Sequence, residues 1–330
     1  MRRRDFITFI GGAVAGWPYM ARAQPETGPV RLVGVLMGFG ESDQGAKSLI
    51  AEFSSALAKS GWKGGSNLRI ELRWGAGDAE RIGAQAKELV GLRPDVILGQ
   101  TTPVANALAR ETRTIPIVFV TVSDPIGSGL AASLRHPGGN ITGFTFVESE
   151  MGGKWVQLLK EIAPRTERAS LLFNPATAPP LQFYLPSIQA AASAFAIQAT
   201  AAPVQAKDEI EGVIATQARS PGGGLIVMPD AFNAANRELI VALAARYQLP
   251  AIYGNDFAAS GGLIFYGSDF VESFRLAAGY VDRILRGTNP GELPIQMPTK
   301  FELTINLKTA KALGLNVPLS MLLRADEVIE

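Results

Sequence analysis

The chain has 330 residues, of which 47% are hydrophobic, and this length suits two domains better than one core. Its 31 Lys and Arg against 30 Asp and Glu leave no basic excess, so we expect neither nucleic acid nor an anionic membrane surface as a partner. With no cysteine and one histidine, the sequence excludes a disulfide framework, a thiolate nucleophile and a His- or Cys-rich metal site, and we expect no cofactor.

The first 23 residues carry the three parts of an export signal. Arginines at positions 2–4 come before a short apolar run, and Ala21-Arg22-Ala23 forms an A-x-A cleavage site. The arginines followed by Asp5 and Phe6 resemble a twin-arginine signal, and the sequence leaves both the Tat and the Sec route open. The apolar run is shorter than the roughly 20 residues that a spanning helix needs. We therefore expect a signal peptide over 1–23, cleavage after Ala23 and a soluble periplasmic protein that is not embedded in the membrane.

Strand and helix patterns alternate after the signal, starting with a short apolar run that is typical of a buried parallel strand. In the first half we predict strands at 32–37, 68–74 (near a sheet edge), 95–98 and 115–120, and helices at 44–60, 79–91 and 102–112. In the second half we predict strands at 169–173, 197–204, 224–228 and 249–253, and helices at 187–195, 209–219 and 236–247. This alternation implies parallel sheets with helices on both faces.

The two halves repeat one pattern. In 94–119 and again in 223–253, a strand and a helix are followed by a strand that begins with (Ile/Leu)-Pro, where a missing N–H is tolerated. Any two strand-helix-strand units look alike, but the matched proline favours a true pseudo-repeat and hence two similar α/β lobes. Glycines cluster between the halves at 138–143, where we place the first hinge crossing. Further crossings are predicted around 261–267 and 290–298.

These crossings divide the chain into two lobes, each made of two segments. The predicted N-terminal lobe comprises 28–143 plus 268–291, and the predicted C-terminal lobe comprises 144–267 plus 292–330. Lobes that are joined more than once are constrained to open and close as hinged bodies.

Several stretches of the mature chain carry a family resemblance. The most specific is Pro-Gly-Gly-Asn-Ile-Thr-Gly at 137–143, and shorter strings lie at 33–36, 94–98, 102–105, 115–119, 123–125, 172–175 and 308–315. On these residues the mature chain resembles the substrate-binding proteins of ABC transporters, in the tryptophan-binding-like branch. The resemblance implies a type I periplasmic-binding-protein fold, with two Rossmann-like lobes, three crossovers, a small-molecule ligand in the cleft and an inner-membrane permease as partner. The lipobox cysteine of lipoprotein members is absent.

Ligands of open α/β sheets lie beyond the carboxyl ends of the strands, so polar residues at these ends are candidates for the site. Thr101 and Thr102 stand at the start of a helix with Pro103 in its first turn, where unpaired N–H groups and the helix dipole stabilise a carboxylate. An ordinary threonine N-cap is the alternative. Ser123 follows the next strand and is expected to point into the cleft, whereas Asp124 before Pro125 is expected to cap a turn or helix.

The candidates of the second lobe are also strand-end residues. Asp230 either binds an ammonium group through a charge-assisted hydrogen bond or caps the following helix. Asn174 is either a turn former or a ligand contact. Tyr253 and Phe39 are expected to supply apolar walls, because binding pockets are mostly apolar with a few placed polar groups.

A carboxylate at Thr102 and an ammonium at Asp230 together make a coherent amino-acid site, and an aromatic carboxylate without an amine stays open. Together with the resemblance, this predicts the solute-binding component of an ABC importer, which closes by its hinge around the ligand and is not an enzyme. The alternatives are a periplasmic ligand sensor on the same fold and a hydrolase working through paired carboxylates. No spacing in the sequence indicates such a pair.

Overall fold

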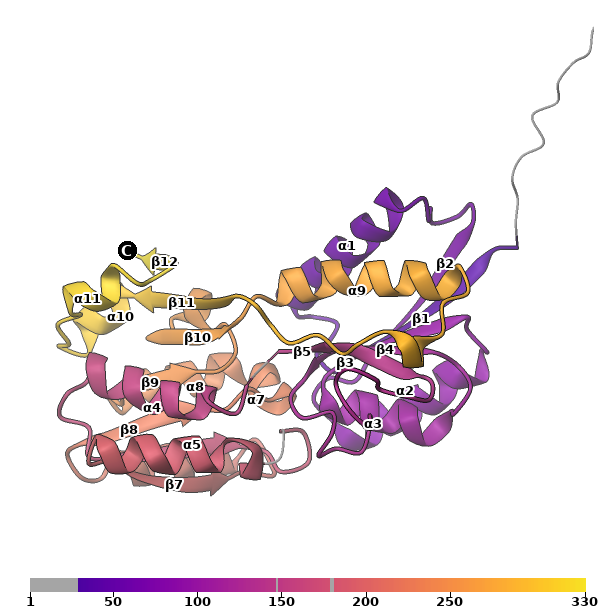
Figure 1. The fold of residues 1–330 in the computed structure, drawn as a ribbon. Helices are drawn as coiled ribbons and strands as arrows, with labels where there is room; N and C mark the ends of the chain where they lie inside the picture. The colour runs from indigo at the N-terminus through magenta and orange to yellow at the C-terminus, as the bar shows by residue number, and fades with distance from the viewer. Residues whose placement is uncertain (1–28, 147, 179–180) are drawn as a thin grey trace, which may run out of the picture.

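The computed structural model describes residues 29–146, 148–178 and 181–330, so the predicted signal peptide and its cleavage site lie outside the described residues. Two sheets, each covered by helices, form two lobes that lie end to end (Figure 1). The N-terminal lobe is drawn at the right of Figure 1 and the C-terminal lobe at the left. Among the described residues, no helix combines the length and the apolar character that crossing a membrane requires.

The sheet of the N-terminal lobe has five parallel strands in the order β2-β1-β3-β4-β5. The strands are β1 (Arg31–Met37), β2 (Leu68–Trp74), β3 (Val96–Gln100), β4 (Ile117–Val122) and β5 (Ile141–Thr145). Its helices are α1 (Gln44–Lys59), α2 (Ala79–Gly91), α3 (Thr102–Glu111) and α9 (Phe270–Leu285). Helices α1 and α9 cover one face, and α2 and α3 cover the other. The position of β2 at the edge confirms the prediction from its alternating pattern.

Both faces of this sheet are buried, which explains its continuous apolar strands. Successive residues of a strand point to opposite faces, so Val33 and Val35 pack with α1 and α9, while Leu36 packs with α2 and α3. Strands buried in this way read as short unbroken apolar runs. The same runs made these strands recognisable in the sequence.

The sheet of the C-terminal lobe has seven strands in the order β12-β11-β10-β9-β8-β6-β7. They are β6 (Arg168–Phe173), β7 (Gln198–Pro203), β8 (Gly223–Val227), β9 (Ala251–Tyr253), β10 (Ile264–Ser268), β11 (Phe301–Asn306) and β12 (Glu327–Ile329). Only the pairing of β10 with β11 is antiparallel among the described pairs. Strands β11 and β12, which lie at one edge of the sheet, come from the C-terminal part of the chain, so this lobe is built from two segments.

Helices cover both faces of the second sheet as well. They are α4 (Met151–Ile162), α5 (Leu181–Ala194), α6 (Glu209–Ala218), α7 (Ala231–Ala235), α8 (Arg237–Arg246), α10 (Leu307–Ala312) and α11 (Leu319–Leu322), with 3-10 turns η1 (Ala258–Ser260) here and η2 (Pro290–Glu292) in the other lobe. Helices α4, α5, α10 and α11 share one core cluster, and α6, α7 and α8 share the other. The predicted helix at 187–195 in fact begins at Leu181, because Pro186 lies inside it without ending it.

The chain crosses between the lobes three times. The first crossing follows Thr145, the second is Asp269 between β10 and α9, and the third lies between Gln296 and β11, after Gln296 has paired with β5. The glycine cluster at 138–143 is therefore not the first hinge, because β5 still belongs to the N-terminal sheet. The exact lobe boundaries drawn from the sequence stay a prediction.

Candidate functional site

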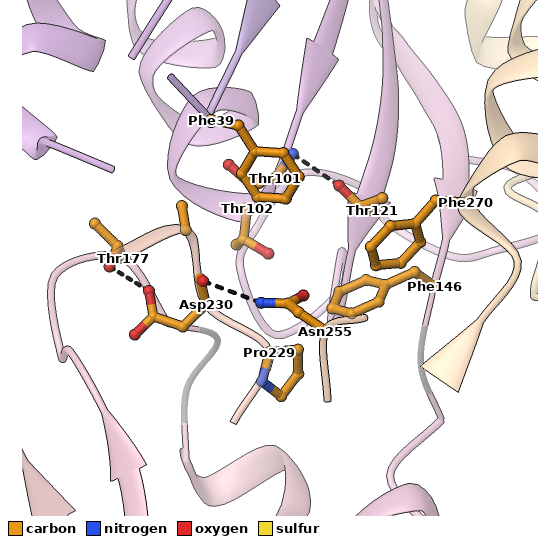
Figure 2. Close-up of a pocket in the computed structure, with 11 residues that line it drawn as sticks. Phe39, Thr101, Thr102, Thr121, Phe146, Thr177, Pro229, Asp230, Asn255 and Phe270 are labelled. Carbon is orange, nitrogen blue, oxygen red and sulfur yellow. Dashed lines mark hydrogen bonds between the residues drawn. The ribbon is translucent and has the colours of Figure 1, made fainter. Parts of the chain in front are cut away.

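A small cavity lies between the lobes at the carboxyl ends of the strands (Figure 2). Its lining comes from three sources: Phe39, Thr101, Thr102 and Thr121 from the N-terminal lobe, Thr177, Pro229, Asp230, Ala231 and Asn255 from the C-terminal lobe, and Phe146 and Phe270 from the crossings. The cavity volume is about 20 Å³, roughly the space of one water. The cleft continues outward past Thr102 and Thr177 into spaces of about 320 and 380 Å³.

Thr101 and Thr121 form the polar side of the cavity and hold unusual backbone conformations. Their φ angles are +81° and +54°, in a region that β-branched residues rarely adopt. Thr101 N–H donates to Thr121 Oγ1 (3.2 Å) and to the Val120 carbonyl (3.0 Å). The register of β4 against β5 shifts between Val120 and Val122, so a bulge turns Thr121 toward the cavity.

The hydroxyl protons of this threonine cluster are uncommitted. Thr101 Oγ1 is buried and has no hydrogen-bond partner in the described structure. Thr102 Oγ1 accepts from Ser123 N–H (3.3 Å) and Thr121 Oγ1 accepts from Thr101 N–H, so each of these hydroxyls keeps its proton to donate. Three threonines that each keep a hydroxyl proton to donate therefore line one side of the cavity, which suits an anionic oxygen.

The same side of the cavity is the start of α3, which differs from the other helices of the N-terminal lobe. Asp43, Asp78 and Asp269 cap α1, α2 and α9 with side-chain hydrogen bonds, whereas Thr101 at the start of α3 makes none. The N–H groups in the first turn of α3, where Pro103 has none, therefore lack a side-chain acceptor from the cap residue and carry the positive end of the helix dipole. Both features favour a negative charge beside Thr102.

Gln100 and Gly38 fix the approach to this helix start. Gln100 is fully buried, its Oε1 accepts from Gly38 N–H (3.1 Å), and its Nε2 has no partner. A Cβ at Gly38 would lie 2.7 Å from Thr101 Oγ1, so only glycine lets β1 and the Thr101 side chain come this close. Gln100 is the last residue of β3, and its unsatisfied amide is visible only in the structure.

Three phenylalanines form the apolar side of the cavity. The rings of Phe146 and Phe270 meet edge to face with centroids 5.6 Å apart, and they stand at the first and second crossings (Figure 2). Phe39 follows β1 and packs against core clusters of both lobes. The aromatic wall is thus attached to the hinge and to both lobes, so its packing depends on how far the lobes are apart.

Asp230 lines the cavity, but its carboxylate is occupied within its own lobe. Its oxygens accept from Thr177 Oγ1, from Phe232 N–H (2.8 Å) and from Asn174 N–H (2.7 Å), which caps α7 and fixes the 174–177 loop. Burial raises the pKa of Asp230 from 3.8 to about 6, and these hydrogen bonds oppose that rise. The predicted cap is therefore present, and the carboxylate is directed at Thr177, away from the phenylalanines (Figure 2).

Asn174 and Asn255 share the neighbourhood of Asp230 in different ways. Asn174 forms a turn, because its Oδ1 accepts from Ala176 N–H (2.8 Å) and its Nδ2 donates to the Gln205 carbonyl (3.2 Å), and it faces the outer cleft. Asn255 lines the cavity itself, with Nδ2 donating to the Asp230 carbonyl (3.1 Å). The structure thus gives Asn174 the turn-forming role and adds Asn255 to the candidates.

Two further residues expected at the site lie behind it. Ser123 is 2% exposed and its Oγ has no partner, but it supports Thr102 through its N–H and does not line the cavity. Tyr253 is 2% exposed in the core of the C-terminal lobe against Phe257, so the expectation that it walls the pocket is wrong. Its strand, β9, is central in the sheet and turns the ring into the α6–α8 layer.

The lobes also touch outside the cavity. Arg237 at the start of α8 donates to Asp43, the N-cap of α1, and both side chains are largely buried. On the same side of the cleft, a Cβ at Gly77 would lie 2.8 Å from the Ala231 carbonyl of the other lobe. These contacts hold the lobes close together in this conformation.

The residues that the structure describes bear on two other kinds of site, a metal site and a pair of catalytic carboxylates. No group of three or more His, Cys, Asp or Glu side chains is arranged to hold a metal ion there. Among the described residues that line the cavity, Asp230 is the one ionisable group. The pair of carboxylates that the hydrolase alternative needs is therefore not assembled in this cavity.

Comparison with known proteins places this geometry in context. Residues 42–329 match a family model described as ABC transporter substrate binding protein. A tyrosine-binding protein of Clostridioides difficile strain R20291 is 25% identical over 264 residues, which are 80% of this chain and 75% of that protein.

Two solved structures share the architecture. A conserved domain protein of Vibrio cholerae O1 biovar El Tor strain N16961 has a TM-score of 0.83 at 26% identity. An ABC domain of Streptococcus pneumoniae in complex with L-Trp has a TM-score of 0.82 at 23% identity. Each comparison covers 91% of this chain and 99% of the other. The resemblance and the two-lobed type I periplasmic-binding-protein fold predicted from the sequence are confirmed.

Proposed function

The chain belongs to the ABC transporter substrate-binding proteins, and from this premise we propose that it captures a small carboxylate between its lobes and delivers it to a membrane permease. The observation that carries the proposal is the threonine cluster at the uncapped start of α3. Thr101 Oγ1 is a buried polar atom without a partner, which is costly in a folded protein unless a ligand supplies one. A carboxylate would accept from this hydroxyl, from its two neighbours and from the helix N–H groups.

The apolar side of the cavity supports a ligand with an aromatic or otherwise apolar body. Phe39, Phe146 and Phe270 add ring faces and edges to the same lining. One relative is named for binding tyrosine and one solved neighbour holds L-Trp, both of which combine a carboxylate with a ring. We therefore propose an aromatic amino acid or an aromatic carboxylate as the ligand class.

Hinge motion follows from the size of the cavity. A space of about 20 Å³ does not admit an aromatic carboxylate, so the lobes have to part for the ligand to enter, and the phenylalanine rings have to move aside for it to be held in the closed conformation. Phe146 and Phe270 stand at two crossings, so a ligand that contacts them acts directly on the hinge. Differential contacts of this kind are what ligand-driven closure requires.

The location of the protein is part of the proposal. The sequence of residues 1–23 reads as an export signal, and we propose that the mature chain works in the periplasm and docks its two lobes on a permease. A sensor would bind the same ligand in the same way and would differ in its membrane partner. Co-purification with a permease and its ATPase supports transport, and co-purification with a receptor supports sensing.

A thermal-shift screen of the chain from Gln24 to Glu330 tests the ligand class. The panel contains aromatic amino acids, aromatic carboxylates, their primary amides, sugars and nucleosides. A ligand at 100 times its Kd stabilises by about 2.7 kcal/mol, and this raises Tm by about 4 °C in a protein of this size. We expect shifts from carboxylates and none from their amides. Shifts confined to sugars or nucleosides would contradict the proposal.

A further inference from the structure

We infer that the cavity recognises its ligand as a carboxylate with an apolar body and that an α-ammonium group adds nothing to the affinity. This inference rests on the proposed function, because it assumes that the threonine cluster holds the carboxylate. It adds to the proposed ligand class that aromatic amino acids and aromatic carboxylates without an amine are recognised through the same two features, the carboxylate and the apolar body. An ammonium group would gain affinity only from groups around the cavity that are free to accept its hydrogen bonds.

Asp230, the one carboxylate among the described residues that line the cavity, already accepts hydrogen bonds from its own lobe. Asp230 accepts from one hydroxyl and two backbone N–H groups, and each of these donors belongs to the C-terminal lobe. Those bonds cap α7 and hold the 174–177 loop, so an ammonium group would have to compete with the local fold of the lobe. Figure 2 shows the carboxylate directed at Thr177, on the side away from Phe146 and Phe270.

The remaining polar groups favour an anion over a cation. Thr101, Thr102 and Thr121 present hydroxyl protons, because two of their oxygens already accept from backbone N–H groups. Within the part of the lining that the structure describes, Asn255 Oδ1 is the one side-chain amide oxygen, and Asn255 is held by its bond to the Asp230 carbonyl. A single neutral oxygen is a poor replacement for the negative partner that a buried ammonium needs.

The charge balance of the cavity points the same way. A zwitterion would bring its carboxylate to the threonine cluster and its ammonium to a wall of phenylalanine rings and committed acceptors. The free-energy cost of removing water from the ammonium group there cancels the gain from any contact that the group makes. Removing the amine from the ligand should therefore leave the affinity unchanged or improve it.

Isothermal titration with matched ligand pairs tests the inference. The pairs are L-phenylalanine with 3-phenylpropionate, L-tryptophan with indole-3-propionate, and L-tyrosine with 3-(4-hydroxyphenyl)propionate, and phenethylamine serves as the analogue that keeps only the amine. We expect each propionate to bind as tightly as its amino acid or more tightly, and phenethylamine not to bind. An amino acid that binds more than about tenfold tighter than its propionate, which is about 1.4 kcal/mol, overturns the inference and leaves the proposed function standing. If no member of any pair binds, the inference falls together with the proposed function.

Two variants separate the role of each end of the ligand. Asp230→Asn keeps the size of the side chain and removes its charge, so it should change the Kd of both members of a pair by the same factor. A loss confined to the amino acids would show that Asp230 binds the ammonium, and would overturn the inference. Thr101→Val should weaken both members of each pair equally, because both carry the carboxylate.

Discussion

Thr101 and Thr121 meet at the ends of neighbouring strands, where Thr101 N–H donates to Thr121 Oγ1 over 3.2 Å while both residues hold positive φ angles. Such backbone conformations cost about 1–3 kcal/mol each. The surrounding β4 bulge and the buried Gln100 hold them in place. Both strained threonines line the same cavity. A strained but fixed backbone at these two positions is expected of a binding site whose hydrogen-bond donors are held in place before the ligand binds.

Replacing Thr101 by valine should weaken ligand binding without lowering the stability of the fold. The hydroxyl has no partner in the structure, so the isosteric Thr101→Val change removes an unsatisfied buried atom and should leave the free energy of unfolding unchanged or raise it by up to about 1 kcal/mol. The ligand carboxylate loses a charge-assisted bond, so Kd should rise roughly 10- to 100-fold. Denaturant unfolding and titration calorimetry measure the two effects.

Thr112→Val is the matched control for that change. Thr112 is also buried, but its Oγ1 accepts from Thr114 N–H (3.2 Å) and Ile115 N–H (3.1 Å) at the far end of α3. We expect it to lower stability by about 1–2 kcal/mol and to leave Kd unchanged. An equal loss of affinity in both variants would mean that Thr101 acts only through stability.

Gly77→Ala should weaken binding by keeping the lobes apart. Its Cβ would lie 2.8 Å from the Ala231 carbonyl across the cleft, so the closed conformation becomes sterically unfavourable. Its positive φ of 70° adds a local cost of about 1 kcal/mol that concerns only its own loop. We expect a higher Kd and, with ligand bound, a larger radius of gyration by small-angle X-ray scattering than the wild type shows.

Gly65→Ala controls for the backbone cost of the Gly77 change. Gly65 has a similar φ of 75°, and a Cβ there meets nothing within 4 Å. It should lower stability by a comparable amount with no change in Kd or in the scattering of the bound state. Equal binding losses in the two variants would argue against contact between Gly77 and Ala231 in the bound state.

The ion pair between Asp43 and Arg237 should stabilise the closed conformation modestly. Asp43→Asn retains the cap on α1, where Asp43 Oδ1 accepts from Ala46 N–H (2.9 Å), but removes the charge that faces Arg237. Partly buried pairs of this kind contribute up to about 1 kcal/mol, so we expect Kd to rise about two- to fivefold. The effect should shrink as salt is added.

Arg246→Gln provides the comparison for the ion pair. Arg246 pairs with Glu211 within the C-terminal lobe, and both are exposed, so its loss should not change Kd at any salt concentration. A Kd that is the same in the wild type and in Asp43→Asn at low salt would show that the pair does not contribute to ligand binding.

Asp230 should make stability depend on pH between about 4 and 6. Its pKa is raised from 3.8 to about 6 by burial, so the folded state retains the proton more strongly than the unfolded state. The contribution of Asp230 to the free energy of unfolding is largest below pH 3.8, the pKa in the unfolded state. It decreases by roughly 3 kcal/mol in total as the pH rises to about 6, the pKa in the folded state. The difference in unfolding free energy between the wild type and Asp230→Asn should fall over this interval. A difference that stays constant or grows with pH contradicts the assignment.

Much of the fold could be predicted because buried parallel strands and amphipathic helices leave clear patterns. The predicted strand at 68–74 and the helix at 79–91 coincide with β2 and α2. The sequence predicts a hinge at 138–143, because Gly143 and the two glycines before β5 hide a short strand that is recognisable only beside β4. Helix α4 was not predicted at all, since Gly152 and Gly153 at its start obscure the pattern.

The site was predictable only where it follows the strand-end rule. That rule led to Phe39, Thr101 and Thr102, which line the cavity. It could not reveal Thr121, whose bulge lies inside an ordinary apolar run, or Phe270, which reaches the cavity because the chain returns to the first lobe after β10. It also could not show that the oxygens of Asp230 are occupied, since that depends on the 174–177 loop folding back on it.

The most direct test of the account is a crystal structure of the chain with the tightest-binding carboxylate of the screen. The account predicts a carboxylate oxygen within hydrogen-bond distance, about 3 Å, of Thr101 Oγ1 and the start of α3, with the ring against Phe146 and Phe270. A ligand whose carboxylate lies against the C-terminal lobe, or which binds outside the cleft, would contradict it.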